Sequence, residues 1–242
     1  HNSGLIPYGA TFLVFTDYMR AAIRLSALSH VGVIWVMTHD SIALGEDGPT
    51  HQPVETIASL RAIPQLTVLR PADGTETSGA YKVAIENASK NRPTLLALSR
   101  QNLPNLAGAS IEGVAKGAYT VVDCEGTPDL ILMGTGSEVL LCVKAAEQLT
   151  SEGKKVRVVS MPSWELFEAQ DAAYKESVLP KAVKKRLSVE AGISMGWCKY
   201  VGDEGDYIAV DRFGASAPGG TCLEKFGFTV ENVVAKAKAL FA

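Results

Sequence analysis

Short, continuous apolar runs recur along this chain, and stretches with the helical spacing of apolar residues lie between them. Runs that stay apolar without alternation are typical of parallel strands covered on both faces. The alternation of such strands with helices predicts wound α/β structure. The predicted strands are 32–37, 66–69, 94–98, 130–133, 156–159, 187–189 and 208–210, and the predicted helices are 16–29, 75–90, 138–152 and 229–241.

An uncharged segment with little periodicity, 101–110, interrupts this pattern and is typical of a linker. A chain of 242 residues has room for one or two domains, because a domain usually takes about 100–200 residues. We therefore predict two wound α/β domains with mostly parallel sheets, 1–110 and 111–242.

Composition excludes several classes of protein. With 47% hydrophobic and 20% charged residues, the chain is close to the globular average, which argues against disorder and disulfide scaffolds. A pI near 5.9 without a long basic run argues against nucleic acid as a partner. The longest charge-free hydrophobic stretch, 25–39, is shorter than the ~20 residues of a bilayer span. Because the chain opens with His and not Met, we expect its natural beginning to lie upstream.

The four cysteines lie far apart and form no C-x-x-C pair, which argues against a metal or redox motif. We expect free thiols, buried or half-buried, in a reducing compartment. These cysteines are Cys124, Cys142, Cys198 and Cys222.

Charge is sparse in the first part of the chain. Residues 1–100 carry 8 Lys and Arg, against 15 in the remainder. A segment poor in long charged side chains is expected to be buried or to lie at an interface. In helix 16–29 the only charges are Asp17, Arg20 and Arg24, so we expect this helix to be buried on most sides.

All four histidines lie within the first 51 residues, and two of them have informative positions. His39 follows a predicted strand, and ligands of α/β sheets bind beyond the carboxyl ends of strands. His51 lies with Asp47 in the Gly- and Pro-rich loop 45–53. Two imidazoles and a carboxylate predict a site that moves protons and recognises hydroxyls. The alternatives are that His51 caps the next helix, or a metal site, for which no third close ligand is evident.

Three aromatic residues, Phe12, Phe15 and Tyr18, recur at every third position across a predicted strand-to-helix turn. They can stack on a flat heterocycle, or they can belong to the core. Arg100 follows another predicted strand, where it can hold a phosphate with two hydrogen bonds or form a surface ion pair.

The junction 134–138 (GTGSE) lies between a predicted strand and a helix. Its backbone N–H groups can hold an anion, but it lacks the third glycine of a dinucleotide motif and the lysine of a Walker motif. The simpler interpretation is an ordinary helix start capped by Ser137 or Thr135. The cluster 181–186 is most simply a solvated basic face, and Asp211 with Arg212 can form an ion pair at a turn.

Several long sequence blocks, found in order from end to end, resemble the corresponding sequences of the transketolase family. Their residues are most similar to those of the chloroplast enzymes of plants and algae. The blocks are 4–13 (GLIPYGATFL), 38–41 (THDS), 45–53 (GEDGPTHQP), 70–74 (RPADG), 98–104 (LSRQNLP) and 211–215 (DRFGA).

This resemblance implies transfer of a two-carbon ketol unit from a ketose phosphate to an aldose phosphate, in the pentose phosphate pathway or the Calvin cycle. It implies thiamine diphosphate and Mg or Ca as cofactors, a homodimer, and the chloroplast stroma or otherwise the cytoplasm. The chain matches most of the family's pyrimidine-binding domain, 1–110, and its C-terminal domain, 111–242.

The resemblance also implies roles for particular residues. Phe12, Phe15 and Tyr18 are expected to line the pocket of the aminopyrimidine ring, with Phe15 stacking on it. His39 and His51 are expected to face the sugar near the reacting carbonyl.

Two further residues are expected to recognise the substrate. Asp47 would recognise a hydroxyl of the sugar beside the reaction centre and so favour the correct stereoisomer of the substrate. Arg100 would hold the distal phosphate.

In the family, the glutamate that bonds the pyrimidine ring and the domain that binds the diphosphate and metal lie upstream of this segment. We therefore expect the isolated chain to be inactive without that N-terminal part. Alternatives are a non-catalytic fragment for dimerisation or regulation, or a related thiamine enzyme such as deoxyxylulose-phosphate synthase or a ketoacid dehydrogenase subunit. Motifs 38–40 and 98–102 favour transketolase.

Overall fold

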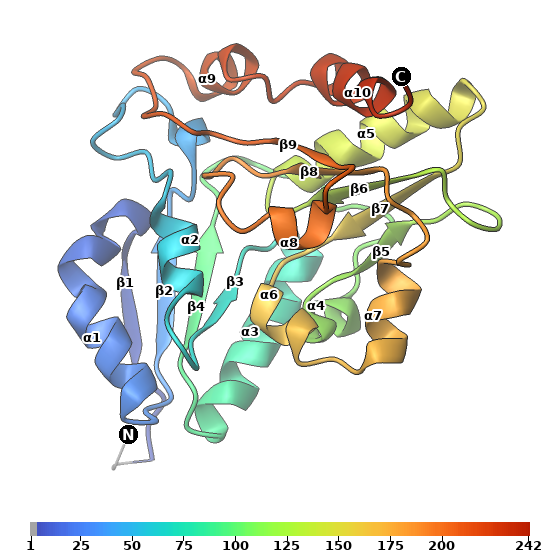
Figure 1. The fold of residues 1–242 in the computed structure, drawn as a ribbon. Helices are drawn as coiled ribbons and strands as arrows, with labels where there is room; N and C mark the ends of the chain where they lie inside the picture. Colours follow the sequence, from blue (N-terminus) through green and yellow to red (C-terminus); the bar gives the residue numbers. More distant parts are fainter. Residues whose placement is uncertain (1–3) are drawn as a thin grey trace.

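The computed structural model describes residues 4–242 and contains two sheets that follow one another along the chain (Figure 1). The first has strand order β1-β2-β4-β3 and is parallel throughout. The second has order β5-β7-β6-β8-β9, in which only β5 runs antiparallel to its neighbour. The predicted fold class, wound α/β with mostly parallel sheets, is therefore confirmed.

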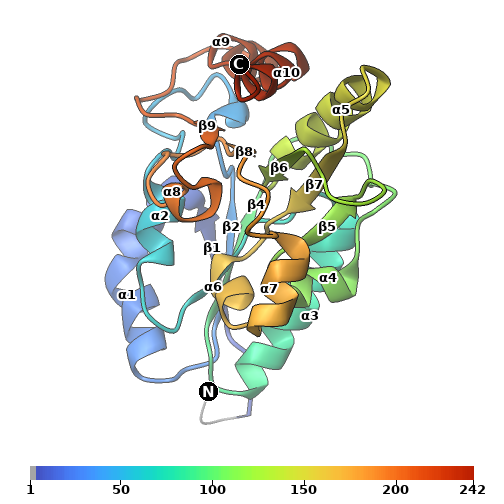
Figure 2. The same cartoon turned by 45° about the vertical axis from the view of Figure 1, so that its right-hand side comes forward.

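Helices cover both faces of the first sheet, with α1 and α2 on one face and α3 on the other (Figures 1 and 2). The strands divide their side chains accordingly, because successive residues of a strand point to opposite faces. Trp35 and Met37 pack with α1 and α2, whereas Ile34 packs with α3. The elements are β1 (Tyr8–Phe12), η1 (Leu13–Phe15), α1 (Thr16–Leu28), β2 (Ile34–Thr38), η2 (Ile42–Leu44), α2 (Thr56–Arg61), β3 (Thr67–Leu69), α3 (Gly74–Ser89) and β4 (Thr94–Leu98).

The second sheet is covered in the same way. Buried residues of α5 and α10 pack on one face, and those of α6, α7 and α8 pack on the other. Its elements are α4 (Ile111–Lys116), β5 (Tyr119–Val122), β6 (Leu130–Gly134), α5 (Glu138–Ser151), β7 (Val156–Ser160), α6 (Trp164–Glu168), α7 (Ala172–Val178), β8 (Arg186–Val189), α8 (Cys198–Val201), β9 (Asp206–Ile208), α9 (Gly219–Lys225) and α10 (Val230–Ala239).

The two sheets are joined by buried polar contacts as well as by packing. Glu76 of α3 is fully buried and accepts hydrogen bonds from Tyr119 Oη (2.7 Å) and Ser160 Oγ (2.5 Å) of the second sheet. Burial raises the pKa of Glu76, while these two bonds act in the opposite direction. The contact lies on the α3 side of the first sheet.

Most of the predicted elements occur, but the edge strands β1 and β5 were missed. Gly9 interrupts the apolar run in β1. A side chain does not fit at this position, because a Cβ there would lie 2.4 Å from the Trp35 ring. The predicted strand 208–210 overlaps β9 at Ile208 alone.

The prediction that α1 is buried on most sides was wrong within this chain, because the helix exposes a broad apolar surface. Tyr18 is 87% exposed and Leu28 62%. The low charge of the helix therefore reflects an apolar outer face. Within residues 4–242, no helix is long and apolar enough to cross a membrane. The exposed large apolar residues of this region are Leu5, Ile6, Tyr8, Tyr18, Leu25 and Leu28.

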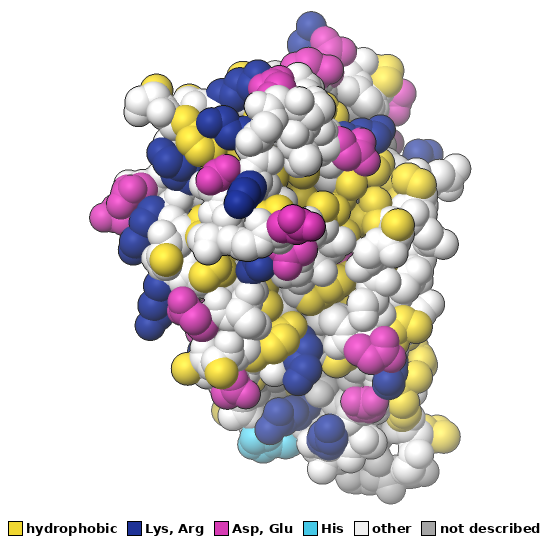
Figure 3. Space-filling view, turned by 90° about the vertical axis from the view of Figure 1, so that its right-hand side faces the viewer, with side chains coloured by type: hydrophobic (Ala, Val, Ile, Leu, Met, Phe, Trp, Pro, Cys, Tyr) yellow, Lys and Arg dark blue, Asp and Glu magenta, His cyan; other side chains and the backbone are white. Residues whose placement is uncertain are grey.

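On the face shown in Figure 3, Lys and Arg side chains are interspersed with Asp and Glu. No patch of a single sign dominates this face. The arrangement offers a nucleic acid no continuous basic surface there.

Candidate active site

The carboxyl ends of β1, β2 and β4 end level with one another. The register pairs Phe12 with Thr38 and Thr38 with Leu98, the last residues of these strands. Residues that follow parallel strands in this register meet at one edge of the sheet. His39 and Arg100 are brought together in this way.

The predicted aromatic residues gather at this edge. The Phe12 and Phe15 ring centroids are 6.0 Å apart with the planes 7° from parallel, and Tyr18 continues the group 6.0 Å beyond Phe15. Phe12 and Phe15 are half-buried and lie outside the hydrophobic cores of the first sheet. The core interpretation of these rings was therefore wrong.

Both histidines contact this aromatic group. The His39 ring stacks on Phe12, with centroids 3.8 Å apart and planes at 26°. The His51 ring meets Phe15 edge-on at 5.3 Å and Phe12 at 6.3 Å. Two imidazoles separated by twelve positions in the sequence thus border one aromatic surface.

Loop 45–53 returns His51 to the aromatic group through tight turns. Gly45 and Gly48 have φ of 101° and 73°, which a side chain at either position would strain. The His51 amide donates to the Gly48 carbonyl at 3.0 Å. Helix α2 begins at Thr56 without a side-chain cap, so the alternative that His51 caps this helix was wrong.

His39 lies in an electrostatic field set by its neighbours. Burial lowers the pKa of the His39 imidazole below its ordinary value of 6.5, and the charge of Arg100 lowers it further, while Asp47 and Asp40 oppose the shift. The neutral imidazole is therefore favoured at neutral pH. Nδ1 lies 2.9 Å from Thr38 Oγ1, which leaves Nε2 as the ring nitrogen open to a ligand.

Arg100 and Asp47 are both exposed beside His39. Arg100 forms no ion pair with any residue of 4–242, so the surface ion pair considered from the sequence is not observed. Its guanidinium is free to hold an anion.

A buried ionic network behind His39 was missed by the sequence reasoning. Arg70 is fully buried, and its Nε donates to Asp40 Oδ2 at 2.8 Å. Its Nη1 donates to Thr135 Oγ1 at 2.9 Å and to Glu138. The only signal in the sequence was the resemblance of block 70–74 to the family.

The junction 134–138 belongs to this network. A Cβ on Gly136 would lie 2.8 Å from the Arg70 guanidinium, so the space beside the turn is filled by Arg70. Ser137 makes no cap hydrogen bond, and Thr135 Oγ1 donates to Glu190 Oε1 at 2.7 Å. The expected side-chain cap is therefore absent.

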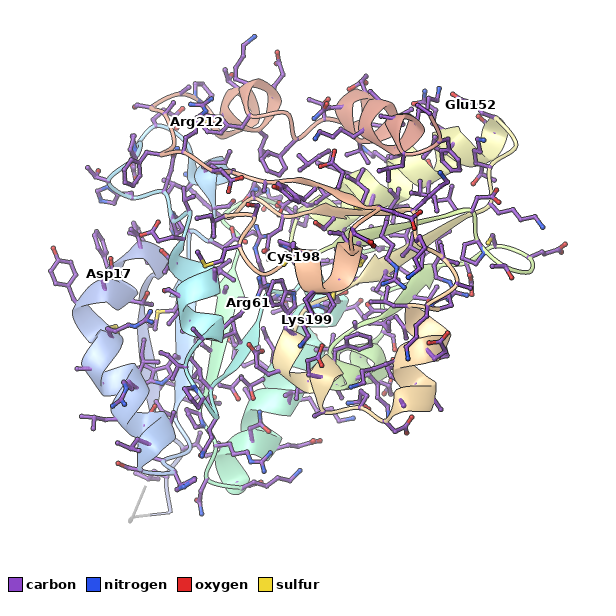
Figure 4. All side chains as sticks on the ribbon, viewed as in Figure 1. Asp17, Arg61, Glu152, Cys198, Lys199 and Arg212 are labelled. Atoms are coloured by element: carbon purple, nitrogen blue, oxygen red, sulfur yellow. The ribbon has the colours of Figure 1, made fainter. Side chains whose placement is uncertain are left out.

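Other sequence predictions had mixed outcomes. The four cysteines are free, but Cys198 on α8 is exposed, contrary to expectation (Figure 4). Asp211 Oδ1 accepts from the Ser194 amide, and Arg212 stacks on Phe226 at 3.7 Å in place of the expected ion pair. Within residues 4–242, no group of three His, Cys, Asp or Glu side chains is arranged to hold a metal.

Comparisons with known proteins identify both parts of the chain. Residues 1–105 match the model of the transketolase pyrimidine-binding domain, and residues 117–229 match the model of the transketolase-like C-terminal domain. The chain belongs to the transketolase family. This assignment replaces the alternative of a related thiamine enzyme.

The most similar relatives include bacterial and plant transketolases. A transketolase of Nostoc sp. is 76% identical over 240 residues, which are 99% of this chain and 36% of the relative. A chloroplastic transketolase of Zea mays is 61% identical over 241 residues, 99% of this chain and 35% of the relative. The chain thus spans about a third of the length of these curated transketolases, and the similarity is not specific to chloroplast enzymes.

Solved transketolase structures share the fold. The enzyme from Leishmania mexicana superposes with a TM-score of 0.93 at 53% identity, covering 98% of this chain and 34% of that chain. A transketolase from Pichia stipitis in complex with sedoheptulose 7-phosphate gives a TM-score of 0.90 at 49% identity, covering 97% and 34%.

Proposed function

We propose that this transketolase chain supplies the pyrimidine pocket and the sugar-facing residues for reversible transfer of a two-carbon ketol unit from a ketose phosphate to an aldose phosphate. The observation that carries the proposal is the single edge at which Phe12, Phe15, His39 and His51 meet. Apolar rings beside two imidazoles suit a flat cofactor next to a reacting carbonyl.

Enzymes of this family depend on thiamine diphosphate, and the aromatic group fits its aminopyrimidine ring. The half-buried rings of Phe12 and Phe15, with Tyr18 beyond, offer an apolar surface that ordinary core packing does not use. When bound, the cofactor supplies the nucleophilic carbon that carries the ketol unit. We assign its diphosphate and its Mg or Ca to an N-terminal transketolase segment outside this chain.

His51 and His39 differ in surroundings, and we assign their roles accordingly. His51 lies against Phe15 and is the closer of the two to the proposed stacking ring, so it moves protons at the reacting carbonyl. Burial and the charge of Arg100 favour the neutral form of His39, and its open Nε2 hydrogen-bonds the sugar or its developing oxyanion.

Arg100 and Asp47 recognise the substrate. The exposed, unpaired guanidinium of Arg100 binds the distal phosphate of the sugar. The Asp47 carboxylate accepts a hydrogen bond from a hydroxyl beside the reaction centre. A substrate with the wrong configuration does not supply this hydrogen bond and is therefore bound less well.

The proposal includes a homodimer. The apolar residues exposed on β1 and α1 form a surface that water would otherwise contact, and Tyr18 joins this surface to the aromatic group. A second copy covers it in our proposal, so that the pocket lies at the subunit interface. We also retain a domain boundary near residue 110, supported by the start of α4 at Ile111 after a segment without helix or strand.

The deciding experiment measures ketol transfer from xylulose 5-phosphate to ribose 5-phosphate by the 242-residue chain with thiamine diphosphate and Mg²⁺. We expect no turnover by the chain alone and turnover once the complementary N-terminal transketolase polypeptide is added. Turnover without that polypeptide would show that the diphosphate and metal sites do not have to come from it. No turnover in either mixture would favour the alternative of a non-catalytic dimerisation or regulatory fragment.

A further inference from the structure

Three of the residues assigned to the sugar are each followed by a residue that connects to the C-terminal domain, either directly or, for Asp40, through Arg70. Asp40 follows His39, Gln52 follows His51 and Gln101 follows Arg100. We propose that the C-terminal domain positions the sugar-facing residues, and that Arg70 and Gln52 of the pyrimidine domain are the positioning residues through which it does so. The assignment of His39 and His51 to the sugar rests on the function proposed above.

The first connection runs from His39 through Asp40 and Arg70. His39 has a left-handed backbone, with φ of 60°, and Asp40 beside it is 1% exposed. The Arg70 guanidinium bridges the Asp40 carboxylate to Thr135 and Glu138, which lie at the turn between β6 and α5. This fixes the chain one residue beyond His39.

The backbone reinforces this connection. The Gly136 amide donates to the Arg70 carbonyl at 3.1 Å, and the Arg70 amide donates to the Pro162 carbonyl at 2.9 Å. Arg70 is therefore held by the C-terminal domain through its main chain as well as its side chain.

The network then returns to the pyrimidine domain. Thr135 Oγ1 donates to Glu190, whose two oxygens accept from the Arg61 guanidinium at 2.8 and 2.9 Å. Arg61 extends from α2 toward the C-terminal domain, where it stacks on Trp164 at 3.9 Å (Figure 4). Burial opposes ionisation of Glu190, but the charge and hydrogen bonds of Arg61, the charge of Arg70 and the Thr135 hydrogen bond together outweigh it and bring the pKa to about 2.

The second connection runs from His51 through Gln52. This side chain is 2% exposed, and its Nε2 lies within 2.9 Å of the Gly45 carbonyl and 3.0 Å of the Ala215 carbonyl. One amide thus joins the two ends of the His51 loop to the C-terminal domain. A Cβ on Gly214 would lie 1.7 Å from Gln52 Oε1, so the facing segment is shaped around this side chain.

The loop itself also touches the C-terminal domain. Ser216 Oγ donates to the Glu46 carbonyl, beside Asp47. A Cβ on Gly48 would lie 3.1 Å from Ser216 Cβ, which shows how closely the two segments approach. A third and longer contact joins Gln101 Nε2 to Ser137 Oγ at 3.5 Å.

Anchors of this kind are needed because the segment between the two histidines is largely irregular. Between β2 and α2 the structure contains only the short η2. Chain without regular structure opens locally at low cost unless side chains fix it. Anchors at both histidines hold the segment at its functional ends.

The test measures how fast diethyl pyrocarbonate modifies each histidine in the 242-residue chain, followed by mass spectrometry. We compare Gln52→Met with Tyr119→Phe, which removes a contact between the same domains at Glu76, away from the histidines. Gln52→Met is expected to raise the modification rate of His51 by about threefold or more. Tyr119→Phe is expected to leave His51 and His39 unchanged, and the exposed His30 serves as the internal reference.

Thr135→Val tests the first connection, because it replaces a bonded hydroxyl of the C-terminal domain with a methyl group of similar size. The expected result is faster modification of His39 with His30 unchanged. In any variant, an equal increase in the modification rates of His30, His39 and His51 would signal unfolding. If Gln52→Met unfolds the chain in this way, Ser216→Ala, which deletes one hydroxyl beside the His51 loop, replaces it as the test of the second connection.

Unchanged His51 and His39 rates in these variants, or equal changes in Tyr119→Phe, would overturn the proposal. In the active assembly, Gln52→Met is further expected to lower kcat by about tenfold with the KM for the sugar phosphate nearly unchanged. Failure of the wild-type assembly to transfer a ketol unit would refute the proposed function alone, because the modification rates do not depend on turnover.

Discussion

The two domains place polar side chains at the same point of their folds, the carboxyl ends of parallel strands, and use them differently. His39 follows β2, is half-buried, and keeps a ring nitrogen open. Thr135 follows β6 and Glu190 follows β8; both are buried, and they bond to each other at 2.7 Å. In the proposed function, a strand end becomes a ligand site where its polar groups are left without internal partners.

Charge shows the same contrast. At the open end, the Arg100 guanidinium forms no ion pair within residues 4–242. In the buried network around Thr135 and Glu190, each charge has a partner of opposite sign, and three of its members, Arg61, Arg70 and Asp40, come from the first domain. This closed network consists of Arg61, Arg70, Asp40, Glu138 and Glu190.

The largest expected effect comes from breaking the closed network. Arg70→Met removes the partner of Asp40 and of Glu138 and leaves both carboxylates buried. Removing one member of a buried ion pair costs about 3–5 kcal/mol of unfolding free energy. Urea denaturation followed by circular dichroism measures this loss.

Arg100→Met is the matched variant at the open end. Since Arg100 is exposed, its replacement is expected to change the unfolding free energy by less than about 0.5 kcal/mol. Equal losses in the two variants would contradict the distinction between an open and a closed strand end.

The same Arg100 variant is expected to have the next largest effect, on binding of phosphorylated sugars. A hydrogen bond to a charged group contributes about 1.5–3 kcal/mol, so kcat/KM with ribose 5-phosphate should fall by about 10- to 100-fold in the active assembly. An unphosphorylated aldose acceptor provides the control, because it has no group for Arg100 to hold. A loss of similar size with both acceptors would remove the phosphate from the proposed role.

Asp47→Asn is expected to have a smaller effect, on stereochemical selection. The exposed carboxylate becomes an amide of nearly the same shape, and the preference for the natural sugar over its epimer should narrow by about tenfold. The measurement is kcat/KM for the two epimers. An unchanged ratio, with both values lowered, would assign Asp47 to general binding.

Much of the fold could be predicted from the sequence because buried parallel strands are continuous apolar runs. Strand β4 was predicted with its observed limits, and α3 and α5 to within one residue at each end. Edge strands carry a weaker pattern, as β1 shows with Gly9 under Trp35. The exposed face of α1 was misjudged because low charge does not distinguish a buried helix from one with an apolar outer face.

The sequence suggested candidate site residues but not the contacts that hold them in place. The positions of His39 and Arg100 follow from strand ends, which apolar runs reveal. Arg70 and Glu190 lie 120 positions apart, and their connection through Thr135 exists only in the folded chain. A charged residue in a sequence is usually solvated, so full burial of Arg70 had no local signal.

The smallest expected effect concerns the pKa of His39. The direction of its shift tests whether Arg100 and Asp47 act on this ring at the open strand end. Burial and then Arg100 lower this pKa below 6.5, while Asp47 raises it. Arg100→Met should therefore raise the pKa of His39, and Asp47→Asn should lower it further. Titration of histidine ring signals by NMR, with the exposed His30 as reference, measures both shifts. Because the neutral ring is favoured in the folded state, the contribution of His39 to stability should fall as the pH drops through 6.5, and less so in Arg100→Met. The absence of a shift in both variants would show that burial alone sets this pKa and that neither charge lies close enough to act with His39 on a substrate.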